Sequence, residues 1–241
     1  MRIAICLCIK DENQYLEEWL NHYIKLGVDH FYMYDNESKV PVVQTILEIR
    51  NLPSGIVDVI EWHDNATGSQ QRAYLDCTRK NQDYNYVGFL DTDEFYMSKT
   101  MDIKRDFWNI EEKYGKNDAL GFYWRVYGQP KPYLEQRQPA DAYTHWFPFN
   151  HIKSFVRPNA IINFPDPHKA NIEGRYIDEL GRKVERPVGE HTSEEIYIKH
   201  IYTRSIPEWQ EKITRGSGDK VNRWKTMDEF YRYNDQCVNH D

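Results

Sequence analysis

Three carboxylates occur within four residues of the segment FLDTDEFY, which spans residues 89–96. Asp91 and Asp93 follow an apolar run, and in an extended segment two side chains at this spacing point to the same side. Such a pair can bind a hard divalent cation, Mg²⁺ or Mn²⁺, which keeps waters and completes its coordination with substrate phosphates. The segment therefore predicts a metal site at Asp91 and Asp93, with Glu94 bracing the strand end. A solvated turn is the alternative, because the D-x-D pattern is common by chance.

The usual phosphate-binding loops are missing from the sequence. It contains neither GxxxxGK[ST] nor a GxGxxG after its first apolar run, which argues against a P-loop NTPase and a Rossmann dehydrogenase. If a nucleotide binds, its phosphates must be held by the metal and by cationic side chains from elsewhere in the chain. Lys212, Arg215 and Lys220 in EKITRGSGDK are the candidates, since a glycine-rich basic segment can close over an anion. The alternative is a solvated basic helix end.

Composition narrows the class of protein. The 241 residues carry a formal charge of -7, and 40% of them are hydrophobic, which suits one large folded domain. The acidic balance argues against nucleic-acid binding. No stretch approaches the roughly 20 apolar residues of a membrane span, and the first apolar run is too short for a signal peptide. The cysteines lack zinc-binding spacing and are expected to be buried thiols, so we expect a cytoplasmic location: Cys6, Cys8, Cys77 and Cys237.

Apolar runs alternate with helical patterns in the first half of the chain, which predicts an α/β fold with a mostly parallel sheet flanked by helices. The expected strands are residues 3–9, 30–36, 55–62 and 84–95, and the expected helices are residues 11–27, 42–50 and 69–80. Later strands are expected at residues 119–128 and 151–162, with one or two helices from Pro207 onward. We expect a single domain, 1–241, with two functional halves, 1–100 and 101–205, and a helical segment, 206–241.

Polar segments follow each predicted strand of the first half. They are KDEN (10–13), YDNES (34–38), WHDNATG (62–68) and DTDE (91–94). Ligands of open α/β sheets bind beyond the carboxyl ends of the strands. These four segments should therefore converge on one crevice.

The segments resemble, in order, glycosyltransferases of families 2 and 92, which have the GT-A fold and use nucleotide-sugar donors. The resemblance begins with CIKDENQYLEEWLNHYIKLGVDHFYMYDNES and continues through QQRAYLDC, FLDTDEF, WRVYG, KSFVRP and KHIYTRSIPEWQEKITRG. It covers most of the chain and is far more specific than D-x-D alone. Small enzymes of this kind occur in bacterial surface-glycan clusters and in large DNA viruses.

The resemblance implies roles for particular residues. Asp91 and Asp93 match the metal and diphosphate motif, and His200, or alternatively His168, would be a further metal ligand. The nucleoside, through uracil or ribose, would contact residues at the ends of the first two strands: Lys10, Asp11, Glu12, Asn13 and Asp35. Residues of the next helix would face the donor, with ordinary helix-surface polarity as the alternative: Gln71, Arg72 and Asp76.

The function implied is metal-dependent transfer of a sugar, with inversion, from a UDP-sugar to a hydroxyl of a glycan acceptor. The resemblance implies that residues 1–100 bind the nucleotide sugar and residues 101–205 bind the acceptor. A carboxylate must then deprotonate that hydroxyl, and Asp141 is the candidate, followed by Glu135 and Asp166. The region lacks the Glu-Asp pair expected of the family. Other classes stay open: a non-catalytic glycan-binding module of the same fold, or a metal-dependent nucleotidyltransferase or phosphohydrolase. The aromatic residues of 123–146 could stack on sugars or fill the core.

Overall fold

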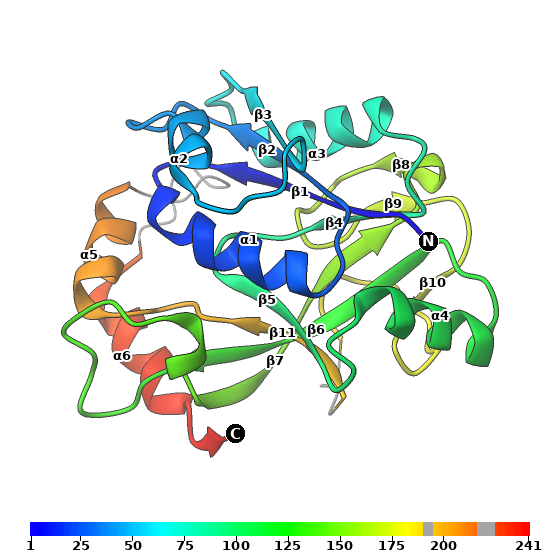
Figure 1. The fold of residues 1–241 in the computed structure, drawn as a ribbon. Helices are drawn as coiled ribbons and strands as arrows, with labels where there is room; N and C mark the ends of the chain where they lie inside the picture. Colours follow the sequence, from blue (N-terminus) through cyan, green and yellow to red (C-terminus); the bar gives the residue numbers. More distant parts are fainter. Residues whose placement is uncertain (190–194, 216–224) are drawn as a thin grey trace.

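The computed structural model describes residues 1–189, 195–215 and 225–241, and a large mixed sheet runs through them (Figure 1). The strand order along the sheet is β3-β2-β1-β4-β7-β6-β11-β5, with β10 beside β6 and β12 beside β7. The strands of the first half are β1 (Ile3–Ile9), β2 (His30–Asp35), β3 (Val57–Glu61), β4 (Tyr86–Phe89) and β5 (Glu94–Ser98). Those of the second half are β6 (Ala119–Gly128), β7 (His145–Val156), β8 (Ile161–Asn163), β9 (Asn171–Ile172), β10 (Tyr176–Asp178), β11 (Ile196–His200) and β12 (Asn239–His240).

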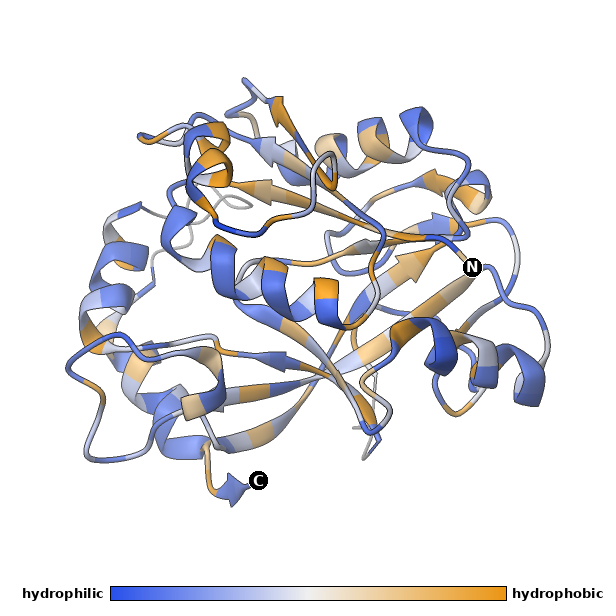
Figure 2. Ribbon diagram, in the orientation of Figure 1, coloured by the Kyte–Doolittle hydropathy of each residue, from blue (hydrophilic) through white to orange (hydrophobic). Residues whose placement is uncertain are grey.

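The first half forms the predicted parallel sheet. Strands β1, β2, β3 and β4 pair in parallel, and helices cover the sheet, so the expected α/β architecture is confirmed. The helices are α1 (Leu16–Lys25), α2 (Val42–Glu48), α3 (Ser69–Lys80), α4 (Ile103–Tyr114), α5 (Ile206–Arg215) and α6 (Met227–Gln236), with 3₁₀ turns η1 (Asn13–Tyr15), η2 (Ala140–Ala142) and η3 (Pro158–Ala160). Figure 2 shows β1 as a largely hydrophobic strand beside helices whose outward turns are hydrophilic, as expected of a strand buried on both faces.

Helix α1 lies against the sheet through an apolar stripe that includes Trp19 and Tyr23, both fully buried. The helix ends before Gly27, whose φ of +88° is the left-handed conformation that terminates helices at low cost. The indole Nε1–H of Trp19 donates to the carbonyl oxygens of Asp91, at 3.0 Å, and Glu94, at 3.1 Å. Trp19 therefore ties the first helix to the acidic segment.

We expect Trp19→Phe to lower the free energy of unfolding by about 1–2 kcal/mol, because it removes both hydrogen bonds and leaves two buried carbonyls short of a donor. Urea denaturation followed by circular dichroism measures the change. Trp108→Phe is the matched control, since Trp108 is 63% exposed on α4, and it should change stability by less than about 0.5 kcal/mol. Equal effects of the two substitutions would contradict the role given to Trp19.

The acidic segment is not the extended strand that we predicted for residues 84–95. Strand β4 ends at Phe89, the chain turns, and β5 begins at Glu94. The amide of Asp91 donates to Glu94 Oε2 at 2.9 Å, and the amide of Glu94 donates to the Asp91 carbonyl at 3.1 Å. These short-range bonds, together with Trp19, favour a turn over continued pairing. The side chains of Asp91 and Asp93 are therefore placed by this acidic turn (residues 90–93) and not by strand alternation.

The second half extends the same sheet and brings a late strand to the acidic turn. Strands β6 and β7 pair antiparallel, and β11 lies between β6 and β5. In this register His200 is opposite Glu94, and the amide of Ile201 donates to the Asp93 carbonyl at 2.9 Å. Within the described residues, no helix combines the length and apolar character that a membrane crossing requires.

Candidate active site

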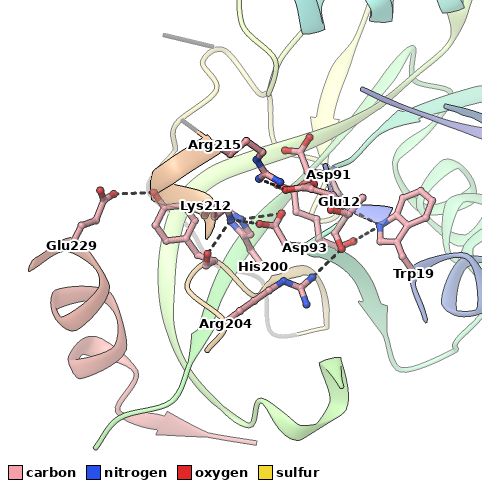
Figure 3. Close-up of polar contacts among 12 residues, drawn as sticks. Glu12, Trp19, Asp91, Asp93, His200, Arg204, Lys212, Arg215 and Glu229 are labelled. Carbon is pink, nitrogen blue, oxygen red and sulfur yellow. Dashed lines mark hydrogen bonds and ion pairs between the residues drawn. The ribbon is translucent and has the colours of Figure 1, made fainter. Parts of the chain in front are cut away.

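A cleft of about 270 Å³ opens where β1 and β4 end, between the start of α3 and helix α5. This is the edge of the sheet where the predicted polar segments were expected to meet. Figure 3 shows the acidic turn facing side chains of β11 and α5. The cleft is lined by Cys8, Ile9, Lys10, Glu12, Asn36, Ser69, Gln70, Asp91, Asp93, Trp124, His168, His200, Tyr202, Lys212, Arg215 and Lys225.

Asp93 lies at the centre of the charged contacts in the cleft. Its Oδ2 accepts from Lys212 Nζ at 2.6 Å, and its Oδ1 lies 3.5 Å from His200 Nε2. Burial acts to raise the pKa of Asp93, but the neighbouring Lys212, His200 and Arg204 outweigh burial and hold that pKa well below its usual range. Asp93 is therefore a carboxylate near neutral pH, and it is able to attract a cation.

Asp91 of the acidic turn and Glu94, the first residue of β5, share a buried lysine. Lys153 of β7 is fully buried, and its Nζ lies 2.7 Å from Asp91 Oδ2 and 3.1 Å from Glu94 Oε2. Burial opposes the charge of Lys153, but Asp91 and Glu94 raise its pKa above the usual value, so the ammonium group is retained. Sequence reasoning did not identify this residue. The signal was a lysine inside the apolar run of the KSFVRP segment.

Asp93, Glu94 and His200 can approach one cation together. Each offers a ligand atom, and these atoms lie within 4.8 Å of one another. Burial lowers the pKa of His200, although Asp93 opposes this, so the imidazole is neutral as metal binding requires. Glu94 Oε1 is buried without a hydrogen-bond partner and could take a ligand role. Two carboxylates and one imidazole suit Mn²⁺ or Mg²⁺, so the residues present fit such an ion.

Compared with the sequence-based prediction, Glu94 joins this group and Asp91 does not. The oxygens of Asp91 instead accept from Gln70 Nε2 at 2.8 Å and from Lys153. Asp91 still lines the cleft, 34% of its side chain is exposed, and its role as a metal ligand stays a prediction.

Helix α5 contributes the predicted cations. Lys212 bonds to Asp93, and Arg215 pairs with Glu12 at 2.5 Å while also donating to the carbonyls of Lys10 and Asp11. Helix α5 is thereby joined to the loop after β1. Both cations line the cleft, as an anion-binding role requires. The third candidate, Lys220, lies outside the described residues.

The residues expected to bind the nucleoside divide into two groups. Lys10 and Glu12 line the cleft. The other three stabilise neighbouring loops: Asp11 accepts from the amide of Lys39, Asn13 donates to Thr45 Oγ1 and the Val40 carbonyl, and Asp35 accepts from the amides of Ser38 and Val42. Their nucleoside contacts stay predictions.

Two of the three residues named on α3 have their side chains engaged outside the cleft. Arg72 forms a two-pronged ion pair with Asp64, and Asp76 accepts from Tyr34 and Lys80. None of the three residues named, Gln71 included, lines the cleft, whereas Gln70 does and reaches Asp91. Adjacent helix positions differ by about 100° around the axis. The sequence therefore predicted the helix but not that Gln70 faces the cleft, and the donor contacts of the three named residues stay predictions.

We expect Gln70→Ala to weaken the binding of UDP with Mn²⁺ about fivefold, because Asp91 loses the donor that orients it. Gln71→Ala is the matched control and should leave the dissociation constant nearly unchanged. Isothermal titration calorimetry measures both variants. A larger effect at Gln71 would show that the donor contacts the other face of α3.

The model of glycosyltransferase family 92 matches residues 2–229. The chain belongs to glycosyltransferase family 92. A family 92 protein of Arabidopsis thaliana is 29% identical over 99 residues, which are 41% of this chain and 17% of that protein. One of Oryza sativa subsp. japonica is 24% identical over 166 residues, 66% of this chain and 27% of that protein. The chain therefore spans about a quarter or less of the length of these two relatives.

Solved structures with a similar arrangement of elements include TarS residues 1–349 of S. aureus in complex with UDP-GlcNAc. It is 17% identical, the match covers 58% of this chain and 40% of TarS, and the TM-score is 0.42. HddC from Yersinia pseudotuberculosis is 11% identical over 88% of this chain and 97% of that chain, with a TM-score of 0.46.

The predicted bases of this family 92 chain lie apart from the acidic turn. Asp141 is exposed on η2, and neither it nor Glu135 lines the cleft. Asp166 accepts from the amide of His168, whose side chain does line the cleft. Burial, followed by the charge of Lys153, lowers the pKa of His168 to about 2, so this imidazole is neutral. The assignment of a base stays a prediction.

One wall of the cleft comes from a residue whose role sequence reasoning left open. Trp124 of β6 is 8% exposed and packs with its ring centroid 4.2 Å from that of His200. It also contacts the rings of His151 and His168, at 5.2 and 5.0 Å between centroids. Of the aromatic residues considered for sugar stacking, Trp124 lines the cleft, while Tyr127 and Tyr143 are fully buried in the core.

Proposed function

We propose that this protein is a glycosyltransferase that binds a nucleoside diphosphate sugar, UDP-linked, in the cleft and transfers the sugar to a hydroxyl of a glycan acceptor. One observation carries the proposal. In a family 92 chain, Asp93 and His200 meet at the carboxyl edge of the parallel strands, and two cations of α5, Lys212 and Arg215, face the same cleft. Together they provide attraction both for a cation and for the phosphates that the cation would neutralise.

A divalent ion, Mn²⁺ or Mg²⁺, would be held by Asp93, Glu94 and His200, and it would supply positive charge that stabilises the departing diphosphate. The chain's own residues account for the remaining electrostatics. Lys212 and Arg215 direct positive charge at the phosphates, and burial increases the strength of these interactions. Lys153 forms ion pairs with Asp91 and Glu94 and so holds the acidic turn in place.

Transfer with inversion further requires a base that accepts the proton of the acceptor hydroxyl. We propose this part from the resemblance, with Asp141 as the named base. Asp141 lies on η2, so it would have to reach a hydroxyl of an acceptor bound beside the cleft. The stereochemistry follows from the anomeric configuration of the product, which nuclear magnetic resonance determines.

Titration calorimetry of UDP tests the proposal, first with Mn²⁺ and then with EDTA. We expect micromolar binding with the metal and a loss of at least tenfold without it. Turnover of UDP-sugars would then be screened against glycan acceptors. Failure of UDP, GDP, CDP and dTDP to bind would overturn the proposal in favour of a glycan-binding module.

A further inference from the structure

Four cationic side chains of the described residues line the cleft. Lys10 donates to Asn65 Oδ1 at 3.1 Å, and two of the other three have acidic partners. Lys212 bonds to Asp93, and Arg215 bonds to Glu12. The fourth, Lys225, was not identified from the sequence. Across residues 1–189, 195–215 and 225–241, no hydrogen bond or ion pair involves its ammonium group.

Lys225 is nevertheless held in a defined place. It immediately precedes Thr226, whose carbonyl accepts the indole hydrogen of the buried Trp209 at 2.9 Å and whose side chain caps α6. Lys225 Nζ lies 5.6 Å from the ring centroid of Tyr202 and 5.8 Å from that of Trp209. Lys212 Nζ lies 5.0 and 6.0 Å from the same two rings. The ammonium groups of Lys212 and Lys225 therefore lie near the same two aromatic rings. Among the described residues, Lys212 forms an ion pair there, with Asp93, and Lys225 forms none.

The ammonium group of Lys225 has no ion-pair partner among the described residues. Burial, followed by the positive charges of Lys212 and Arg215, lowers the pKa of Lys225 to about 7, although Asp93 and Glu12 act in the opposite direction. The phenol ring of Tyr202 also faces the ammonium group. An anion in the cleft would reverse this balance, because it would favour the charged form of the lysine.

We propose that Lys225 binds the diphosphate of the nucleotide and completes, with Lys212 and Arg215, a three-cation site for that group. The inference rests on the proposed function and adds a binding residue to it. It also predicts that nucleotide binding takes up a proton, because Lys225 must become charged to engage the diphosphate.

The sign of the linkage follows from the two states of Lys225. The free protein has a pKa near 7 at this group, and the bound protein a higher one, so binding at pH 8 takes up close to one proton. Below about pH 6 the lysine is already charged and the uptake disappears. Affinity should therefore fall as the pH rises, by about fivefold between pH 7 and pH 8.

The experiment is calorimetry of UDP with Mg²⁺ at pH 8.0 in two buffers of different ionisation enthalpy, which gives the number of protons taken up. The terminal phosphate of UDP, with a pKa near 6, is already ionised at this pH. The variants are Lys225→Met and Lys225→Arg, with Lys25→Met, an exposed lysine of α1, as the matched control. Uridine, which lacks phosphates, is the second ligand.

We expect wild type and Lys25→Met to take up close to one proton per UDP. Lys225→Met should bind UDP at least tenfold more weakly without proton uptake, and Lys225→Arg should retain affinity with neither uptake nor pH dependence. Uridine should bind all four proteins alike. If Lys225→Met binds UDP with wild-type affinity and proton uptake, this inference is wrong and the proposed function survives. If the wild type binds no nucleoside diphosphate at all, the proposed function itself fails.

Discussion

Asp93→Asn should lower kcat/KM for sugar transfer by about a thousandfold or more, which corresponds to roughly 4 kcal/mol of transition-state stabilisation. The substitution removes the charge that attracts a cation beside His200 and leaves Lys212 without its ion-pair partner. Asparagine keeps the shape of the side chain, so the fold should survive. Steady-state kinetics with a UDP-sugar and Mn²⁺, supported by calorimetry of UDP, measures the effect.

The control for this variant is Asp83→Asn. Asp83 forms an exposed ion pair with Arg2 on the protein surface, and its side chain is 65% exposed. Such pairs contribute little, so both catalysis and stability should remain close to wild type. Transfer by Asp93→Asn at the wild-type rate, in the presence of EDTA, would exclude the metal-dependent mechanism.

Lys153→Met should lower the free energy of unfolding by about 3–5 kcal/mol, the range found when one partner of a buried ion pair is removed. Lys153 and Glu94 are fully buried, and Asp91 also depends on the same ammonium group. Chemical denaturation gives the change. Lys183→Met is the matched control, because Lys183 is 79% exposed in its pair with Glu185 and should contribute less than about 1 kcal/mol.

A double-mutant cycle separates lost packing from an uncompensated charge. Glu94→Gln in the Lys153→Met background should recover about 1–2 kcal/mol, because it removes the buried carboxylate that Lys153 no longer balances. Additive losses in the double variant would mean that Lys153 stabilises the fold only through its packing.

The parts of the fold encoded by local pattern were predictable from the sequence. Helix α3 was predicted at residues 69–80 and is found there, since it follows Gly68, whose φ is +83°, and ends before Asn81. The strand–helix alternation likewise predicted the parallel strands and the edge at which the cleft lies. Periodicity and turn chemistry depend on neighbouring residues, so a single sequence displays them.

The acidic turn and its cations were less predictable because they depend on distant residues. Apolar residues on both sides of Asp91 suggested one strand, but Trp19, 72 residues earlier, holds the turn. Lys153 reaches Asp91 across 62 residues, and Gln70, not its neighbour, has the right phase on α3. Single-sequence reasoning found the residue types of the site, while the pairing among them required the tertiary structure.

The order in which the chain is made has a consequence for the acidic turn. Asp93 is synthesised 119 residues before Lys212. At a synthesis rate of about 5–20 residues per second, Asp93 is present in the growing chain for roughly 6–24 seconds before its ion-pair partner Lys212 is made. Over most of that time β11, the neighbour of β5 among the described strands, has not been made, so β5 presents an unpaired edge on which another strand could add. The first half of the chain is therefore expected to need protection on the ribosome until β11 covers that edge of β5 and α5 brings Lys212 to Asp93.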